Sequence, residues 1–202
     1  MEKKIINLIQ SPAIYQFQQK IGGMEEFYKN IINSEVNLNQ IKNVLDIGCG
    51  LGSHSEFFDK DSNYIGIDLN IKRVNYAIEK YQSTNRVFEC SSINNLKTNL
   101  EFDLAILIGV IHHLSNKEIE DFVSDLKSST LKINKLIILD PVKIPKQKLL
   151  SKILQKLDVG ANIKLQHEYT KFYDGLNFKS EVLYNEKLSF TPFLKTVIKL
   201  NS

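Results

Sequence analysis

A glycine-rich segment that follows an apolar stretch is the part of the chain best suited to bind a ligand. Residues 44–52 read V-L-D-I-G-C-G-L-G, with one acid, Asp46, ahead of the alternating glycines. Glycine adopts positive φ readily and lets a ligand approach the backbone closely. A second apolar segment ends in Asp68, twenty residues after Gly48. A βαβ unit delivers a carboxylate to the hydroxyls of a ribose at this spacing. The pattern predicts a nucleoside-type ligand at the carboxyl end of a parallel sheet.

Two features distinguish between the possible nucleosides. The dinucleotide-binding spacing G-x-G-x-x-G would place its third glycine at position 53, where the chain has Ser53. Asp46 would also stand close to a bound pyrophosphate, and like charges ~4 Å apart repel by roughly 1–4 kcal/mol near a protein surface. A cationic ligand without phosphate, S-adenosylmethionine, reverses the sign of that interaction. An NAD(P)-dependent oxidoreductase is the alternative.

The order of the motifs resembles that of the seven-stranded, Rossmann-like (class I) S-adenosylmethionine-dependent methyltransferases. The segments that carry the resemblance lie within residues 40–142 and are 46–52, 66–68, 102–106, 110–114 and 136–141. The resemblance implies an α/β fold with three αβα layers around seven strands, mostly parallel, with an antiparallel C-terminal hairpin. It also implies an N-terminal helical cap and methyl transfer from S-adenosyl-L-methionine, with S-adenosyl-L-homocysteine as the product.

The resemblance further implies which residues hold the cofactor. Asp68 is expected to accept hydrogen bonds from the ribose, although a strand-end acid can also simply cap the next helix. Leu69 and Ile93 would enclose the adenine, and Ile108 and Gly109 would present carbonyl groups to the methionine amino group. The family usually has an acid after the third strand, where this chain has Ser92. The predicted cofactor residues are Asp46, Gly48, Cys49, Gly50, Gly52, Asp68, Leu69, Ser91, Ser92, Ile93, Ile108 and Gly109.

Three polar residues after the fourth and fifth predicted strands are candidates for catalysis. His112 and His113 lie where the crevice should open, and a histidine can act as a base because it titrates near neutral pH. In the family, such a pair often packs against the cofactor loop instead. Asp140 either orients the acceptor or bonds to its own loop. Tyr15, Gln19 and His113 are the predicted substrate contacts.

Length and composition favour an ordinary soluble protein. With 202 residues, the chain is expected to form a single methyltransferase domain: a helical cap (1–38), a cofactor-binding core (40–142), and a C-terminal helix with an edge hairpin (143–202). The net charge of +3 is too small to imply nucleic acid. No secretion signal or membrane-spanning run is evident, so a cytoplasmic location is expected. The two cysteines suggest neither a disulfide framework nor, with the histidines as spaced, a metal cluster.

Alternating hydrophobic patterns predict the individual elements. Ser11–Pro12 is expected to begin one helix of the cap, and a second apolar stripe starts at Met24. Asn70 should cap the second core helix, and Ser115 with Glu118 forms a capping box. The expected strands are 42–47, 63–68, 86–90, 103–109, 134–140, 178–188 and 193–200. The expected helices are 52–59, 71–82, 116–128, 145–157 and a short one at 168–173.

The helix expected at 145–157 has a lysine-rich face and an apolar face. We expect it to pack on the sheet with its lysines in solvent. A basic amphipathic helix lying on an anionic membrane is the alternative.

The sequence therefore predicts a methyltransferase acting on a small molecule, with O-methylation of a sugar or natural-product-like acceptor as the preferred reaction. A non-catalytic module that binds S-adenosylmethionine and a partner is a further alternative. No stable membrane insertion is expected.

Overall fold

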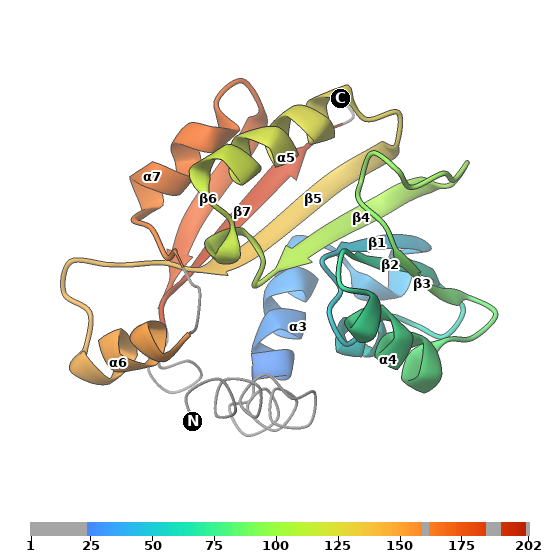
Figure 1. Cartoon of the computed structure of the whole chain (residues 1–202), viewed down its shortest axis with the longest axis horizontal. Helices are drawn as coiled ribbons and strands as arrows, with labels where there is room; N and C mark the ends of the chain where they lie inside the picture. The colour runs from blue at the N-terminus through green and yellow to red at the C-terminus, as the bar shows by residue number, and fades with distance from the viewer. Residues whose placement is uncertain (1–23, 159–161, 185–190, 201–202) are drawn as a thin grey trace.

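The protein is built around a seven-stranded mixed sheet. The computed structural model describes residues 24–158, 162–184 and 191–200. The strands stand in the order β3-β2-β1-β4-β5-β7-β6 (Figure 1). β1 to β5 run parallel, and β7 runs antiparallel to both β5 and β6. The strands are β1 (Asn43–Ile47), β2 (Asn63–Asp68), β3 (Arg86–Cys90), β4 (Glu101–Ile108), β5 (Lys132–Pro141), β6 (Asn177–Leu183) and β7 (Phe193–Lys199). The predicted fold class is confirmed.

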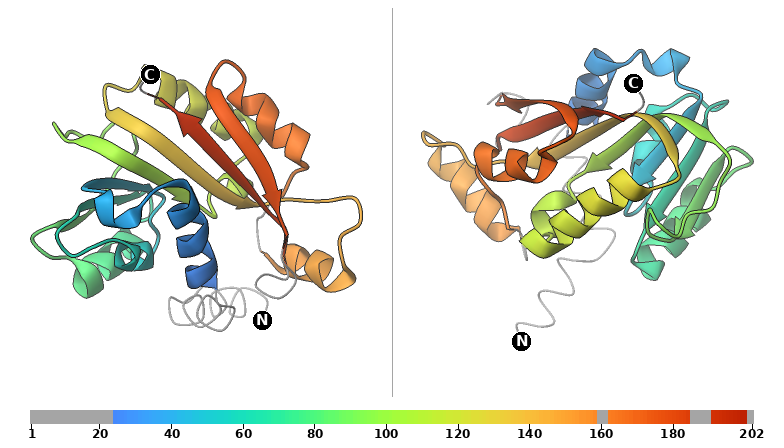
Figure 2. Two further views of the ribbon diagram at one scale, coloured as in Figure 1. Left: turned by 180° about the vertical axis from the view of Figure 1, so that it is seen from behind. Right: turned by 90° about the horizontal axis from the view of Figure 1, so that it is seen from above.

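Helices cover both faces of this sheet. α3 (Met24–Glu35) and α4 (Ile71–Tyr81) pack on one face, and α5 (Asn116–Ser128) and α7 (Gln166–Thr170) on the other. Figure 2 shows α3 and α5 on opposite sides when the sheet is viewed from above. α6 (Leu149–Leu157) lies off to one side of the sheet, apart from both helical layers (Figure 1). β1 and β4 lie side by side at the point where the strand order reverses, which opens a crevice at their carboxyl ends.

The central strands are apolar on both faces because both faces are covered. In β4, Leu104 and Ile106 contribute to the core beneath α3 and α4, while Ala105 and Leu107 contribute to the core beneath α5. All four side chains are buried. This burial fixes the register of the strands whose ends form the crevice.

Two helix caps agree with the sequence-based expectation. The Asn70 side chain accepts hydrogen bonds from the backbone N–H groups of Lys72 and Arg73 at the start of α4. Ser115 and Glu118 form the predicted capping box at the start of α5. Both caps begin a helix shortly after a strand end at the crevice, so they help to fix the loops there.

The predicted helix at 52–59 is wrong in type, because only a short 3-10 turn, η2 (Ser53–Phe57), forms there. Gly52 precedes it in the left-handed conformation and provides no side-chain cap. The Ser55 hydroxyl donates to the carbonyl of Gly52 at 2.7 Å, and serine side chains that bond to nearby backbone compete with regular helix.

The predicted helix at 145–157 begins later, at Leu149, and does not pack on the sheet as expected. Pro145 and its neighbours form a turn instead. The backbone N–H of Ile144 donates to the Gln147 side chain at 3.4 Å across this turn. The strand expected at 178–188 is described as Asn177–Leu183, and its remaining predicted residues fall partly outside the described residues. The cap helix expected from Ser11 also lies outside them.

Candidate active site

The glycine-rich turn after β1 has the predicted backbone geometry. Gly48, Gly50 and Gly52 have φ values of 74°, 55° and 83°. A Cβ on Gly48 would lie 2.6 Å from the Val110 side chain, so this glycine is required by packing. A Cβ on Gly50 would meet nothing within 4 Å. Gly50 therefore leaves its side of the turn open for a ligand to approach the backbone.

Asp68 connects the end of β2 to this turn. Its Oδ2 accepts a hydrogen bond from the Gly50 N–H at 3.0 Å, and its Oδ1 accepts one from the Asn70 N–H at 2.8 Å. Asp68 is half-buried. Each carboxylate oxygen can accept more than one hydrogen bond, so both retain capacity for a ligand hydroxyl. Asp68 thus bonds to the glycine turn and to the next loop while it stays accessible to a ligand, and the cap of the next helix is Asn70 instead.

Asp46 is fully buried beneath the turn. Its Oδ2 accepts a hydrogen bond from the Tyr64 hydroxyl at 2.5 Å and lies 3.2 Å from Nδ1 of His54. Its Oδ1 has no hydrogen-bond partner among the residues that the structure describes. Burial and the charge of Asp46 raise the pKa of Tyr64, which keeps that hydroxyl a donor. This arrangement favours an indirect role for Asp46, in which it orients the turn.

The residues predicted around the adenine differ in exposure. Leu69 is 79% exposed, whereas Ile93 is buried. Ser91 is buried and Ser92 is half-buried. The exposed Leu69 side chain beside the strand end is an apolar surface that a planar ring could cover. Ile93 exposes very little of its side chain to such a ring.

Two other predicted cofactor residues lie at the ends of β1 and β4. Cys49 is buried, and burial raises the pKa of its thiol, so it packs as a small apolar residue. Its Sγ would lie 3.0 Å from a Cβ added to Gly66. Gly109, next to the buried Ile108, has a φ of 67° and donates its N–H to the Leu139 carbonyl at 2.8 Å. Gly109 thereby turns the chain away from β4 at the crevice.

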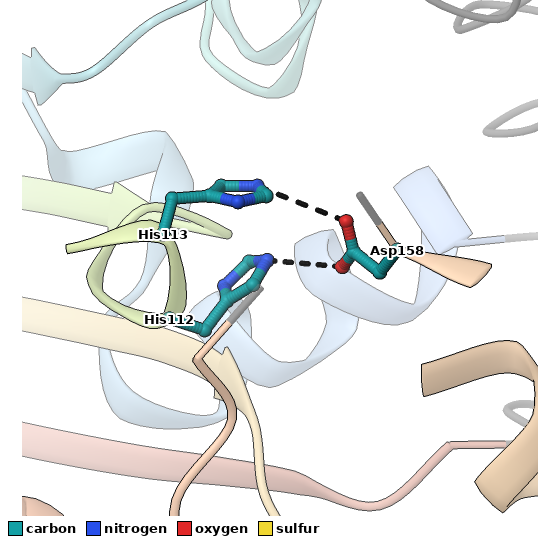
Figure 3. A group of neighbouring side chains, drawn as sticks. All are labelled: His112, His113 and Asp158. Carbon is teal, nitrogen blue, oxygen red and sulfur yellow. Dashed lines mark ion pairs between the residues drawn. The ribbon is translucent and has the colours of Figure 1, made fainter. Parts of the chain in front are cut away.

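The candidate catalytic residues form one cluster after β4 and β5. Nδ1 of His112 lies 2.5 Å from Oδ1 of Asp140. Nε2 of His112 lies 3.2 Å from Oδ2 of Asp158, as Figure 3 shows. Asp140 also accepts hydrogen bonds from the backbone N–H groups of Ile111 and His112. Nε2 of His113 is 4.0 Å from Oδ1 of Asp158. Asp140 is buried, and both of its carboxylate oxygens hold the histidine turn.

The two neighbouring histidines have opposite pKa shifts. Burial alone would lower the pKa of His112, but its hydrogen bonds to Asp140 and Asp158 outweigh burial and raise the pKa to about 9. Burial and the adjacent His112 charge lower the pKa of His113 below its usual 6.5. At neutral pH His112 is a cation, whereas His113 is neutral and can accept a proton.

This cluster also has the residue types of a metal site. One possible ligand atom each from His112, His113 and Asp158 lie within 4.8 Å of one another. A histidine binds a metal through an unprotonated nitrogen. In His112 both nitrogens face carboxylates and its pKa is about 9, so a metal ion would have to displace a proton at neutral pH.

Asp158 is the site residue that sequence reasoning missed. It follows α6, and it is the sole acid between Asp140 and Glu168 in the sequence, which is the one signal that could have singled it out. It also lines a hollow of about 470 Å³ together with lysine and glutamine side chains. The hollow's lining includes Lys143, Gln147, Lys152, Gln155, Lys156, Asp158 and Ile163. The predicted substrate residues Tyr15 and Gln19 lie outside the described residues.

The fold and this crevice define a class of protein. A sheet in the order β3-β2-β1-β4-β5-β7-β6 with an antiparallel β7, a glycine turn after β1 and an acid at the end of β2 is the architecture of the class I methyltransferases.

The comparisons with known proteins agree with this class. Residues 44–131 match the family described as "Methyltransferase domain". The chain carries a class I S-adenosylmethionine-dependent methyltransferase domain, and S-adenosylmethionine is the cofactor of the enzyme. Among curated proteins, none matches the sequence.

Several solved structures share the fold. Magnesium protoporphyrin IX methyltransferase from Synechocystis PCC 6803, with bound S-adenosylhomocysteine, has a TM-score of 0.64 and 18% identity over 99% of this chain and 100% of that one. A SAM-dependent methyltransferase from Aquifex aeolicus has a TM-score of 0.65 and 20% identity over 94% and 99%. Human N-acetylserotonin methyltransferase has a TM-score of 0.67 and 13% identity over 94% and 55%. At these identities, the likeness concerns the fold.

Within the described part of the chain, the helices are all too short or too polar to span a membrane.

Proposed function

We propose that this methyltransferase acts on a hydroxyl group of a small molecule, such as a sugar or a natural-product-like acceptor. The observation that carries the proposal is the geometry of the pair His112–His113. The His112 ring is held between Asp140 and Asp158, whereas the neighbouring His113 imidazole is 45% exposed. The lowered pKa of His113 is consistent with a neutral base at pH 7. A hydroxyl must lose its proton to become a good nucleophile, and a positioned base accelerates such a step by roughly 10²–10⁴-fold. S-adenosylmethionine supplies an activated methyl group when it is bound.

In the proposed mechanism, residues around the crevice hold the cofactor. Asp68 accepts from the ribose, the open side of Gly50 lies against the cofactor, and exposed Leu69 covers the adenine. We propose that the other cofactor residues predicted from the sequence line or support the same crevice. Two of these, Gly48 and Cys49, shape the turn by donating their N–H groups to the Ile67 carbonyl. Alignment of the methyl donor with the acceptor contributes more to the rate than any single residue does. Orientation alone can lower the barrier of such a displacement by ~7–11 kcal/mol.

His113 is the proposed base. Its imidazole is 45% exposed, so an acceptor hydroxyl can reach it. When His113 takes the proton, the Asp158 carboxylate at 4.0 Å stabilises the new charge. His112 cannot take this role at neutral pH, because it already carries a proton between Asp140 and Asp158. We therefore assign His112 and Asp140 to positioning, although the sequence suggested either as catalytic.

The hollow of about 470 Å³ is the proposed acceptor site. Asp158 lines it together with Lys143, Lys152 and Lys156. Its volume falls in the range of small-molecule sites. The lysines favour an acceptor that carries a negative group. We further propose that residues 1–202 act as one domain, with the first 38 residues as a cap, and that the enzyme is cytoplasmic.

The test is to measure S-adenosylhomocysteine formation with a panel of hydroxylated sugars, sugar acids and phenols, and with matched amines. At least one hydroxyl compound should raise the rate above background, and His113→Gln should remove most of that increase. Turnover with the amines alone would refute oxygen as the acceptor atom. Binding of NAD without any S-adenosylhomocysteine binding would instead favour the oxidoreductase alternative.

A further inference from the structure

Helix α6 presents its apolar side to solvent. Leu149, Leu150, Ile153 and Leu154 are 74%, 50%, 45% and 39% exposed. In a nine-residue helix these positions lie along one side, because residues four apart share a face. Ser151, on another side, is buried. The usual arrangement of a surface helix, apolar side inward, is therefore reversed.

Polar contacts hold the helix in this orientation. Gln147 is buried just before the helix, and its Nε2 donates to the Ser151 hydroxyl at 2.6 Å. Nε2 of Gln155 donates to the Val142 carbonyl at 3.0 Å. The ion pair of Asp158 with His112 ties down the end of the helix. These contacts face the protein, so the leucine and isoleucine side chains face away from it.

The charge around the apolar side has one sign. Residues 141–157 contain five lysines and no aspartate or glutamate. Lys148, just before α6, and Lys152 and Lys156 within it recur every four residues and are exposed. A row of cations beside an exposed aliphatic side matches a surface that combines anionic headgroups with acyl chains. Exposed aliphatic patches of this kind mark interaction sites.

We propose that α6 docks on an anionic membrane surface, with its aliphatic side chains among the acyl chains and its lysines on the lipid headgroups. The helix lies in the plane of the surface and does not cross it. This inference goes beyond the proposed function and does not depend on methyl transfer. The hollow lined by Lys152 and Lys156 would then lie next to the membrane, where it can receive an acceptor from that surface.

Sedimentation of the full chain with phospholipid vesicles tests the proposal. The protein should bind vesicles of mixed phosphatidylcholine and phosphatidylglycerol, and bind phosphatidylcholine alone much more weakly. Raising the salt concentration should weaken binding to the mixed vesicles, because it screens the lysines. Absence of binding to the mixed vesicles, or equal binding to both kinds, would overturn the proposal.

Matched variants separate α6 from the rest of the surface. Ile153→Ser should weaken vesicle binding by roughly fivefold or more, because it removes an aliphatic side chain that becomes buried among the acyl chains on binding. Val87→Ser, at an aliphatic side chain 43% exposed on β3 compared with 45% for Ile153, should leave binding unchanged. Lys152→Gln should weaken binding more than Lys60→Gln, which removes an exposed lysine elsewhere. Equal losses within either pair would refute a site on α6.

Two further measurements distinguish the membrane proposal from self-association through α6 and from a failure of the proposed function. If light scattering shows a dimer that Ile153→Ser dissociates while vesicle binding is unchanged, α6 is a self-association surface and the membrane proposal fails. S-adenosylhomocysteine binding should be the same in all four variants. If a variant on α6 loses vesicle binding but still binds S-adenosylhomocysteine, the loss is a property of the α6 surface. If the unmodified protein does not bind S-adenosylhomocysteine, the assignment as a methyltransferase fails and the membrane proposal is unaffected.

Discussion

His112 and Asp158 form an ion pair across 46 residues of sequence, with 3.2 Å between Nε2 and Oδ2. The pair joins the turn after β4 to the end of α6, so the loop that carries the proposed base and the helix that borders the proposed acceptor site are held together. Because Asp140 binds the other ring nitrogen, His112 keeps its proton and cannot exchange roles with His113.

The first prediction concerns the pH dependence of stability. The folded pKa of His112, about 9, lies above the unfolded value of 6.5, so the folded state binds more protons between these values. The stabilisation is complete below pH 6.5 and is lost as the pH rises through about 9. The free energy of unfolding should fall by on the order of 3 kcal/mol over this interval. Urea denaturation at a series of pH values measures it.

Asp158→Asn is the matched variant for this measurement. It retains the size of the side chain but removes one of the two charges that raise the pKa of His112, so the slope should become shallower. An unchanged slope would show that another group is responsible.

The second prediction concerns the pH dependence of turnover. Because the pKa of His113 is lowered below 6.5, kcat should rise through a midpoint below pH 6.5 and then stay level toward pH 8. His113→Gln should reduce kcat by roughly 10²-fold or more and remove the acid limb, with little change in the KM for S-adenosylmethionine. A midpoint near pH 9 would assign the base to His112 instead.

Local patterns made most of the fold predictable from the sequence. The β2 and β3 boundaries and the two caps at Asn70 and Ser115 follow from apolar runs and capping residues that act within a few positions. The expected helix at 52–59 failed because side-chain to backbone bonding by Ser55 and the burial of His54 against Asp46 decide that segment.

The site was only partly predictable, for a related reason. The glycine turn and Asp68 are close in sequence and carry a recognisable spacing. Asp158 acquires its role only through a contact with His112 that the tertiary fold creates. The orientation of α6 was misjudged because amphipathicity shows that a helix has two sides and does not show which side the protein binds.

The third prediction concerns Asp68. Asp68→Ala should raise the dissociation constant of S-adenosylhomocysteine about tenfold or more, because it removes a charge-assisted acceptor and loosens the Gly50 turn. Isothermal calorimetry measures the constant, with Asp61→Ala as a control that removes an exposed acid elsewhere. Equal affinity in the Asp68 variant and the unmodified protein would exclude Asp68 from the site.

The fourth prediction contrasts two glycines of the same turn. Gly52→Ala should destabilise the protein by about 1–3 kcal/mol, because its Cβ would lie 2.8 Å from Ala77 and 2.9 Å from the Phe88 ring. In Gly50→Ala the added Cβ meets no protein atom within 4 Å, so stability falls only by the backbone strain of about 1 kcal/mol. Cofactor affinity should fall markedly, because the Cβ would occupy the side of the turn that the cofactor approaches. Thermal unfolding with and without S-adenosylhomocysteine distinguishes the two. Normal affinity in Gly50→Ala would mean that the ligand does not approach this turn.

The fifth prediction concerns metal ions. Since His112 holds a proton between two carboxylates, turnover should be unaffected by EDTA, and added Zn²⁺ should inhibit if it displaces that proton. Loss of activity in EDTA with recovery on adding a divalent cation would instead make the cluster a metal site.

A crystal structure of the protein with S-adenosylhomocysteine tests the central claim most directly. We expect the ribose hydroxyls to lie within hydrogen-bond distance of Asp68 and the ligand to lie against Gly50. The open side of the sulfur should face His113. A ligand bound elsewhere, or a His113 side chain turned away from the sulfur with the acceptor hollow closed off, would contradict it.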